Sequence, residues 1–259
     1  MEIIADTHIH FYPANDAARL VRGAAQRLTQ VARSSAPVLA LFLVEPHGFH
    51  YFAELRRERD AIGGGVAVEP SPEEEAVCVR LPDGPDVWLL AGRQMATSER
   101  MEILALTSAT VFPERQPAER TVAMVLEAGA VPVLAWAVGK WMFRRAEVAG
   151  ALCRAYGPDR LWLGDSALRP VGWPQPALMA DPARRVLAGS DPLPVPGDED
   201  QAGTYGIRLE GDFDARRPVT SFRRLLHADP AMIERVGKRN NVHTVCRRLT
   251  ALQAARRAS

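Results

Sequence analysis

The chain has 259 residues, 47% of them hydrophobic and 24% charged, which is ordinary for a globular protein with a buried core. Its formal net charge is +1, so it lacks the strong positive field that attracts many proteins to nucleic acid or to anionic membranes. No apolar run approaches the roughly 20 residues that cross a bilayer. Its three cysteines show neither disulfide nor metal-knuckle spacing. We therefore expect a cytoplasmic protein that acts on a small molecule, without nucleic acid or a membrane as partner; self-association is left open.

The first part of the chain alternates strands with helices. The apolar run 2–10 predicts a strand, and apolar residues at helical spacing predict a helix over 15–33, with Asn15 as its N-cap. The continuous apolar run 37–45 is typical of a strand that is buried on both faces of a parallel sheet. A further helix is expected over 47–62.

Between residues 63 and 100 the pattern changes. Three consecutive glycines, Gly63 to Gly65, end the preceding helix. Apolar residues then alternate with polar ones on both sides of a Pro-Asp-Gly-Pro turn, which predicts antiparallel strands. We therefore expect residues 63–100 to be an antiparallel β insertion after the second strand–helix unit.

The alternation then resumes. Strands are expected over 101–108, 131–138, 161–164, 186–189 and 205–211, and helices over 117–128, 144–156 and 221–255. About seven such units predict one α/β domain over residues 1–259, a TIM-like (βα) barrel with C-terminal helices over 221–259. An open doubly wound sheet is the alternative, which the absence of a glycine-rich loop after the first strand disfavours.

Ionisable side chains follow the first predicted strand at its carboxyl end, where the active sites of such barrels lie. Asp6, His8 and His10 alternate along this strand, and alternate residues of a strand point to one face. Neutral imidazole is a favoured ligand of zinc and iron. We therefore expect His8 and His10 to converge on a metal at the barrel mouth, with Asp6 orienting a histidine from behind.

Other candidate site residues follow the later strands or lie in the insertion: Glu45, His47, Arg93, Lys140, Asp165, Arg169 and Asp191. Glu45, His47, Arg93 and Arg169 are predicted to contact the substrate, Arg169 through a bidentate clamp on an anionic group. Asp165 is predicted as a general base or a ligand, with a helix N-cap as the alternative. Lys140 is predicted to bind an anion, to form a Schiff base or to carry a carboxylate between metals; a structural ion pair is the alternative.

Two segments resemble metal-dependent hydrolases. Asp-x-His-x-His at residues 6–10 is similar to the amidohydrolase superfamily and to PHP-type and TatD-type phosphoesterases and nucleases. The segment LAGSDPLP, residues 187–194, resembles the part of amidohydrolases that carries an aspartate for metal binding and proton transfer. The resemblance implies a βα barrel in which His8 and His10 are ligands, and Asp191 is a ligand or the base that activates water.

The resemblance covers the two ends of the barrel and not its middle. Amidohydrolases usually supply a histidine from each of two middle strands, and PHP enzymes use more histidines still. This chain has none between His50 and His227. We therefore expect a divergent member with one divalent metal, held by His8, His10 and Asp191. Zinc is favoured, with iron and manganese as alternatives.

These residues predict a metal-dependent hydrolase. The metal would lower the pKa of a bound water, and Asp191, Lys140 and Asp165 would be the catalytic residues. The attack would fall on the carbonyl carbon of an amide or ester, or on the phosphorus of a phosphoester, in a small anionic substrate. Two alternatives stay open: a degenerate barrel that binds a ligand without turnover, and a lyase or aldolase that depends on Lys140.

Overall fold

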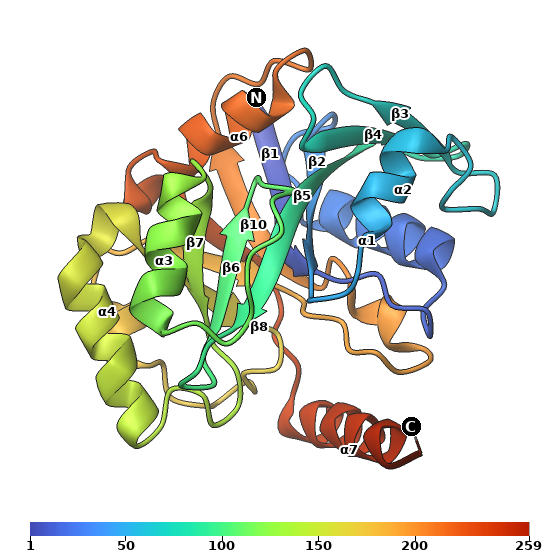
Figure 1. Ribbon diagram of the computed structural model, residues 1–259. Coiled ribbons are helices and arrows are strands. Elements are labelled where there is room, and N and C mark those ends of the chain that lie inside the picture. The colour runs from blue at the N-terminus through green and yellow to red at the C-terminus, as the bar shows by residue number, and fades with distance from the viewer. Residues whose placement is uncertain (259) are drawn as a thin grey trace.

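The computed structural model describes residues 1–258. One mixed sheet curves into a nearly closed barrel with helices packed around it (Figure 1). Its strands are β1 (Glu2–Ile9), β2 (Val38–Glu45), β3 (Ala67–Pro70), β4 (Ala76–Arg80), β5 (Val87–Ala96), β6 (Glu102–Leu106), β7 (Val131–Ala135), β8 (Trp162–Ser166), β9 (Val186–Gly189), β10 (Tyr205–Glu210) and β11 (Glu234–Gly237). The helices are α1 (Ala17–Val31), α2 (Tyr51–Arg57), α3 (Ala118–Glu127), α4 (Arg144–Arg160), α5 (Ala177–Ala180), α6 (Pro218–Leu226) and α7 (Val242–Ala258).

The sheet order is β11-β10-β1-β2-β5-β6-β7-β8-β9, with the β3–β4 hairpin attached to β5. Two hydrogen bonds join β1 to β9 and to the residues that follow β9: Thr7 Oγ1 donates to Ala188 O at 2.9 Å, and Asp191 N donates to His8 O at 2.9 Å. The ends of β1 and β9 therefore meet, which confirms the predicted α/β barrel in its coarse form.

The count of about seven regular βα units is not confirmed, because several barrel strands are antiparallel. β5 and β6 form a hairpin in which only residues 97–101 lie between the strands. A parallel crossover needs a dozen residues or more, so this connection can only return antiparallel. β10 runs antiparallel to β1, and β11 runs antiparallel to β10.

The predicted insertion is smaller than residues 63–100. β3 and β4 form the expected hairpin, but β5 is a barrel strand that pairs with β2 in parallel and with β6 in antiparallel orientation. β5 is buried almost throughout. Part of the alternation that predicted the insertion thus belongs to β5, a barrel strand to which the β3–β4 hairpin is attached through β4.

Three predicted helices differ from the structure in extent. The helix expected over 47–62 is reduced to α2, because Gly48 has φ 83° and the chain turns there before the helix begins. α4 reaches Arg160, but Gly157 has φ 66° and breaks the regular helix after Tyr156, where the sequence predicted its end. The C-terminal helical segment is interrupted by β11, which separates α6 from α7.

Candidate metal centre

A bulge in β1 directs the two histidines into the barrel. Asp6 pairs with Leu41 of β2 and Ile9 pairs with Leu43, so β1 has one more residue than β2 over this stretch. Side chains alternate along a strand, and an extra residue reverses the alternation. Ile9 packs in the outer core with α1, and His8 and His10 point the other way. The prediction that Asp6 shares their face is therefore wrong.

Four polar atoms meet where these histidines end. His8 Nε2 lies 3.0 Å from His10 Nε2 and 3.0 Å from Gln94 Oε1. Asp191 Oδ1 lies 3.6 Å from each of the two Nε2 atoms. The ligand atoms of His8, His10 and Asp191 all lie within 4.8 Å of one another, and all three side chains are buried. Two imidazoles and one carboxylate are an established set of ligands for a catalytic zinc or iron.

Asp191 reaches the histidines through an unusual backbone conformation. Its φ is 54°, in the left-handed region that residues other than glycine rarely adopt. Its amide donates to His8 O, and its carboxylate Oδ2 accepts a hydrogen bond from Ser166 Oγ at 3.1 Å. Strain of this kind persists where surrounding contacts over-determine it, and it clusters at functional sites.

The protonation states of the cluster suit a cation. Burial lowers the pKa of His10, so its imidazole is neutral at pH 7 and has a lone pair to offer. Burial would raise the pKa of Asp191, but the charge of protonated His8, the hydrogen bond and charge of protonated His10, and the charge of Arg248 outweigh it and hold that pKa below its usual range. A neutral imidazole and an ionised carboxylate are the forms that bind metals, so these residues fit a divalent cation.

Asp6 supports the site from outside the barrel. Its carboxylate accepts hydrogen bonds from the amides of His8 and Ser190 at 3.2 and 3.0 Å, and from Gly203 N at 2.8 Å. Ser190 Oγ donates to it as well. Burial raises the pKa of Asp6 to about 6, against the opposing effect of these hydrogen bonds. Asp6 therefore joins β1 to the segment before Asp191, in place of the predicted contact with an imidazole ring.

The predicted substrate contacts near β2 form a group of their own. Glu45 is buried, accepts from Phe52 N at 2.9 Å at the start of α2, and pairs with Arg93 Nη1 at 2.9 Å. Arg93 also donates to Phe49 O at 2.7 Å. His47 is exposed. The structure joins Glu45 to Arg93, and the substrate-binding roles predicted for these residues stay predictions.

Asp165 and Arg169 form a buried pair. Arg169 Nε and Nη2 donate to the two Asp165 oxygens at 2.7 and 2.6 Å. Tyr205 Oη donates to Asp165 at 2.8 Å, and Arg235 pairs with it at 3.2 Å. Lys140 forms an ion pair with Glu102. Asp165, Arg169 and Lys140 thus have protein partners, and their catalytic and substrate-binding roles stay predictions.

Two residues at the cluster were not among the predicted ligands. Gln94, next to the predicted Arg93, is the one whose side chain reaches His8. Its position beside Arg93 on β5 was the available signal. Arg248 of α7 donates to Asp191 O at 2.7 Å. Nothing in the local sequence could show this contact, because it joins distant elements.

No family model matches this chain, and no curated protein sequence does. Solved structures do. PsfC from Pseudomonas syringae PB-5123 superposes with a TM-score of 0.58 at 14% identity, over 99% of this chain and 98% of that one. A two-domain protein from Bacteroides vulgatus that contains a predicted PHP-like metal-dependent phosphoesterase superposes with a TM-score of 0.52 at 12% identity, over 92% of this chain and 65% of that one. The lesion-specific endonuclease PfuEndoQ from Pyrococcus furiosus superposes with a TM-score of 0.50 at 13% identity, over 91% of this chain and 58% of that one.

The chain shares its fold with the protein that contains a predicted PHP-like metal-dependent phosphoesterase. The predicted resemblance to metal-dependent hydrolases is therefore confirmed at the level of the fold, and the buried His-His-Asp cluster fits a divalent metal. At 12–14% identity these likenesses show the fold alone. The chain spans 58% and 65% of the endonuclease and of the two-domain protein, so the activities of those whole proteins are not transferred to it.

The prediction about partners needs a correction. Nucleic acid was set aside because the net charge is only +1, but a lesion-specific endonuclease has this fold. Net charge reports the sum over the molecule and says nothing of local clusters of basic residues, so it could not exclude this partner. Among residues 1–258, no helix is both long and apolar enough to span a bilayer.

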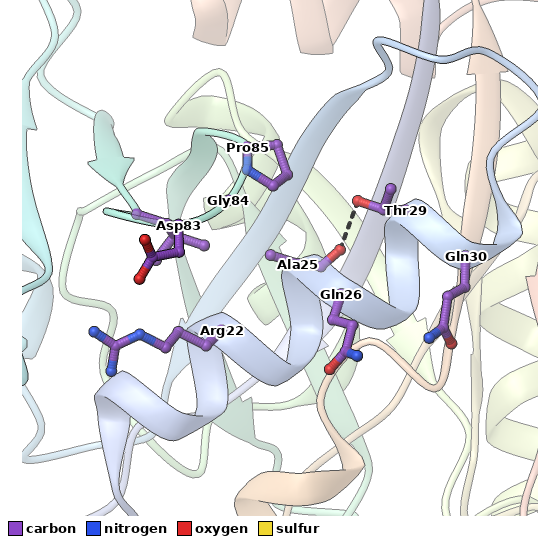
Figure 2. Close-up of a pocket in the computed structure, with 9 residues that line it drawn as sticks. Arg22, Ala25, Gln26, Thr29, Gln30, Asp83, Gly84 and Pro85 are labelled. Carbon is purple, nitrogen blue, oxygen red and sulfur yellow. Dashed lines mark hydrogen bonds between the residues drawn. The ribbon is translucent and has the colours of Figure 1, made fainter.

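A separate groove of about 480 Å³ lies between α1 and the turn that joins β4 to β5 (Figure 2). Arg22, Gln26 and Gln30 of α1 lie along one side, and Asp83 lies on the turn opposite. None of the residues of the metal cluster lines it. We assign it no function.

Proposed function

We propose that the protein is a metal-dependent phosphoesterase with one divalent cation, zinc favoured, held by His8, His10 and Asp191. The observation that carries the proposal is the convergence of these three buried ligands within 4.8 Å at the mouth of the barrel. The fold of the predicted phosphoesterase favours phosphorus over a carbonyl carbon as the centre attacked. When bound, a divalent cation supplies Lewis acidity at this position.

The side chains around the cluster have distinct tasks in this proposal. Asp191 acts as a ligand, because its Oδ1 lies 3.6 Å from Nε2 of both His8 and His10. Tyr12 lies beside His10, with ring centroids 5.1 Å apart. Burial and the nearby Asp191 raise the pKa of Tyr12, so its hydroxyl keeps its proton and can donate a hydrogen bond to a phosphoryl oxygen.

The test combines metal analysis with hydrolysis assays on an aryl phosphomonoester, an aryl phosphodiester and an aryl carboxylic ester. The purified chain should hold about one equivalent of divalent metal and hydrolyse a phosphoester, because two imidazoles and a carboxylate suffice for a catalytic site. The His8→Ala/His10→Ala double variant should lose both the metal and the activity. His50→Ala, at an exposed histidine, is the matched control and should retain both.

The alternatives predict other results. Metal uptake without hydrolysis of any substrate would favour a barrel that only binds a ligand. Hydrolysis of the carboxylic ester alone would move the reaction to carbonyl carbon. Activity that survives loss of both histidines and is abolished by Lys140→Met would favour the lysine-dependent reaction.

A second candidate concerns the substrate, and a basic cleft favours nucleic acid. This cleft, of about 520 Å³, lies between α1 and the segment that joins β11 to α7. Arg27, Lys238 and Arg239 line it together with Asn240 and Asn241, and no acidic side chain is among its described lining residues. Cations and amides without acids suit the phosphates of a nucleic-acid strand, which dominate its binding.

Fluorescence anisotropy with a labelled single-stranded oligonucleotide tests this candidate. The Lys238→Glu/Arg239→Glu variant should bind at least about tenfold more weakly and with a shallower salt dependence, because fewer counterions are released. Arg57→Glu, at an exposed position of α2 outside the cleft, is the control for the change of charge. Equal binding by the two variants would remove the cleft from the proposal and leave the phosphoesterase assignment intact.

A further inference from the structure

The segment that presents Asp191 is held by the C-terminal helix. α7 lies beyond the barrel end toward which β5 runs (Figure 1). Arg248 of α7 is only 3% exposed, and its Nη2 donates to Asp191 O at 2.7 Å. Asp191 N donates to His8 O at 2.9 Å. The backbone of this strained residue is therefore hydrogen-bonded on both sides, once to β1 and once to α7.

The same guanidinium fixes the loop after Asp191. Its Nε and Nη2 lie 2.9 and 2.7 Å from the two carboxylate oxygens of Asp198, which is also buried. Asp198 Oδ2 accepts a further hydrogen bond from Leu193 N at 2.6 Å. Arg248 and Asp198 thus tie together both ends of the short segment 191–198.

Apolar contacts dock α7 against the same loops. Leu168, Leu193 and Val195, from the segments after β8 and β9, pack with three residues of α7: Leu249, Leu252 and Ala255. Burial of these side chains fixes the position of the helix, and Arg248 lies on its buried face one residue before Leu249.

We propose that Arg248 is a positioning residue of the metal centre and that α7 is part of that centre, although no residue of α7 is a ligand. The proposal rests on the metal site of the proposed function. A φ of 54° is tolerated by aspartate better than by most residues but is less favourable than negative φ, so loss of a hydrogen bond that holds this backbone favours rotation toward negative φ. That rotation would move the Asp191 carboxylate away from His8 and His10. The hydrogen bond from Arg248 opposes it.

The decisive variant separates this role from the loss of a buried ion pair. Arg248→Met alone would leave Asp198 as an uncompensated buried charge and would destabilise the fold. The Asp198→Asn/Arg248→Met double variant removes both charges, and the oxygen of the new side-chain amide can still accept from Leu193 N. The double variant should fold, yet it lacks the donor to Asp191 O. Arg247→Met, at the exposed neighbouring position of α7, is the matched control.

Two measurements follow on metal-free protein: circular dichroism with thermal unfolding, and titration with Co²⁺ followed by calorimetry and visible absorption. We expect the double variant to bind Co²⁺ about 10- to 100-fold more weakly than the wild type, as is usual when a residue that orients a ligand is lost. Its absorption bands should also change, because the Asp191 carboxylate is displaced. Arg248→Lys, which has one compact ammonium in place of a planar fork, should restore affinity in part.

The outcomes distinguish this inference from the proposed function. A folded double variant with wild-type affinity and spectrum overturns the role of Arg248 and leaves the metal site standing. If the double variant does not fold, Arg248→Lys becomes the test. Wild-type Co²⁺ affinity and spectrum in Arg248→Lys would overturn the role of Arg248, and weaker Co²⁺ binding would support it. A wild-type chain that binds no metal overturns the proposed function, and this inference with it.

Discussion

At the residue scale, one extra residue in β1 decides which side chains meet. Without the bulge between Asp6 and Ile9, His8 and His10 would lie on the same face as Ile4, which packs against α1. With it, the imidazoles enter the barrel and Asp6 remains outside to bind Ser190 and Gly203. The bulge therefore places His8 and His10 in the candidate metal centre and leaves Asp6 outside the barrel, where it supports that centre.

Gln94 is the first residue to test. Its Oε1 lies 3.0 Å from His8 Nε2, where a neutral oxygen donor would face a bound cation. Gln94→Leu should weaken the binding of Mn²⁺ about tenfold, and Gln94→Glu should strengthen it, because an anionic ligand attracts the cation more strongly. Calorimetric titration gives both affinities. Gln26→Leu makes the same change at an exposed position of α1, and equal affinities for all three variants would exclude a role for Gln94.

Asp6 should leave a signature in the pH dependence of stability. Its pKa is raised to about 6 in the fold, whereas an unfolded aspartate titrates near 3.9. The folded chain therefore holds a proton that the unfolded chain has released. The stabilisation is complete below about pH 4 and is lost as the pH rises through 6, with an upper limit of about 3 kcal/mol.

Urea unfolding of metal-free wild type and Asp6→Asn at pH 4, 5, 6 and 7 measures this contribution. Asparagine does not titrate, so the variant does not lose this stabilisation. The free energy of unfolding of the variant minus that of the wild type should therefore increase as the pH rises. His10 and Asp191 titrate in both proteins, and their contributions largely cancel in the difference. Parallel pH profiles for the two proteins would contradict the raised pKa.

At the element scale, the Asp165–Arg169 pair joins strands that are distant in sequence. Asp165, the last residue but one of β8, binds Arg169 in the following loop, Tyr205 at the start of β10 and Arg235 of β11. The sequence placed an acid and an arginine four residues apart after a strand, which suggested a clamp for a substrate. The fold brings Tyr205 and Arg235 to the same carboxylate, so Asp165 links β8 to β10 and β11.

Asp165→Asn should therefore act on stability. Removing one partner leaves Arg169 buried without its counter-charge, which costs about 3–5 kcal/mol. Asp159→Asn removes the partner of Arg185 at a side chain that is 82% exposed, and should cost less than about 1 kcal/mol. Chemical denaturation compares the two. If Asp165→Asn is as stable as Asp159→Asn but loses phosphoesterase activity, the catalytic role predicted for Asp165 is the correct one.

At the scale of the whole molecule, closure of the barrel assembles the candidate site. His8 and His10 lie at the end of β1 and Asp191 follows β9, so the cluster exists only where β9, at one end of the sheet, comes back against β1. Gly189 makes that approach possible. A Cβ at this position would lie 2.3 Å from His8 Cβ and 2.7 Å from His8 N, closer than side chains approach one another in proteins.

Gly189→Ala should therefore force β9 away from β1. We expect a loss of about 1–3 kcal/mol in the free energy of unfolding, together with weaker metal binding, because Asp191 follows two residues later. Gly150→Ala, within α4, adds the same methyl group beside the flexible Arg154 side chain and should be neutral or stabilising by up to about 1 kcal/mol. Thermal unfolding and metal titration of both variants provide the comparison. Wild-type metal affinity in Gly189→Ala would show that closure does not set the ligand geometry.

The sequence alone determined the α/β class, most strand positions and the three candidate ligands, because these depend on local patterns. Continuous apolar runs mark buried strands, and residue types that bind metals follow two of them. The tertiary structure decided the antiparallel pairing of β5 with β6, the bulge that turns His8 and His10 inward, and the contacts of Asp165, Gln94 and Arg248. Each of these depends on residues far apart in the chain, whose approach is set by packing of the whole barrel and is not encoded in any one segment.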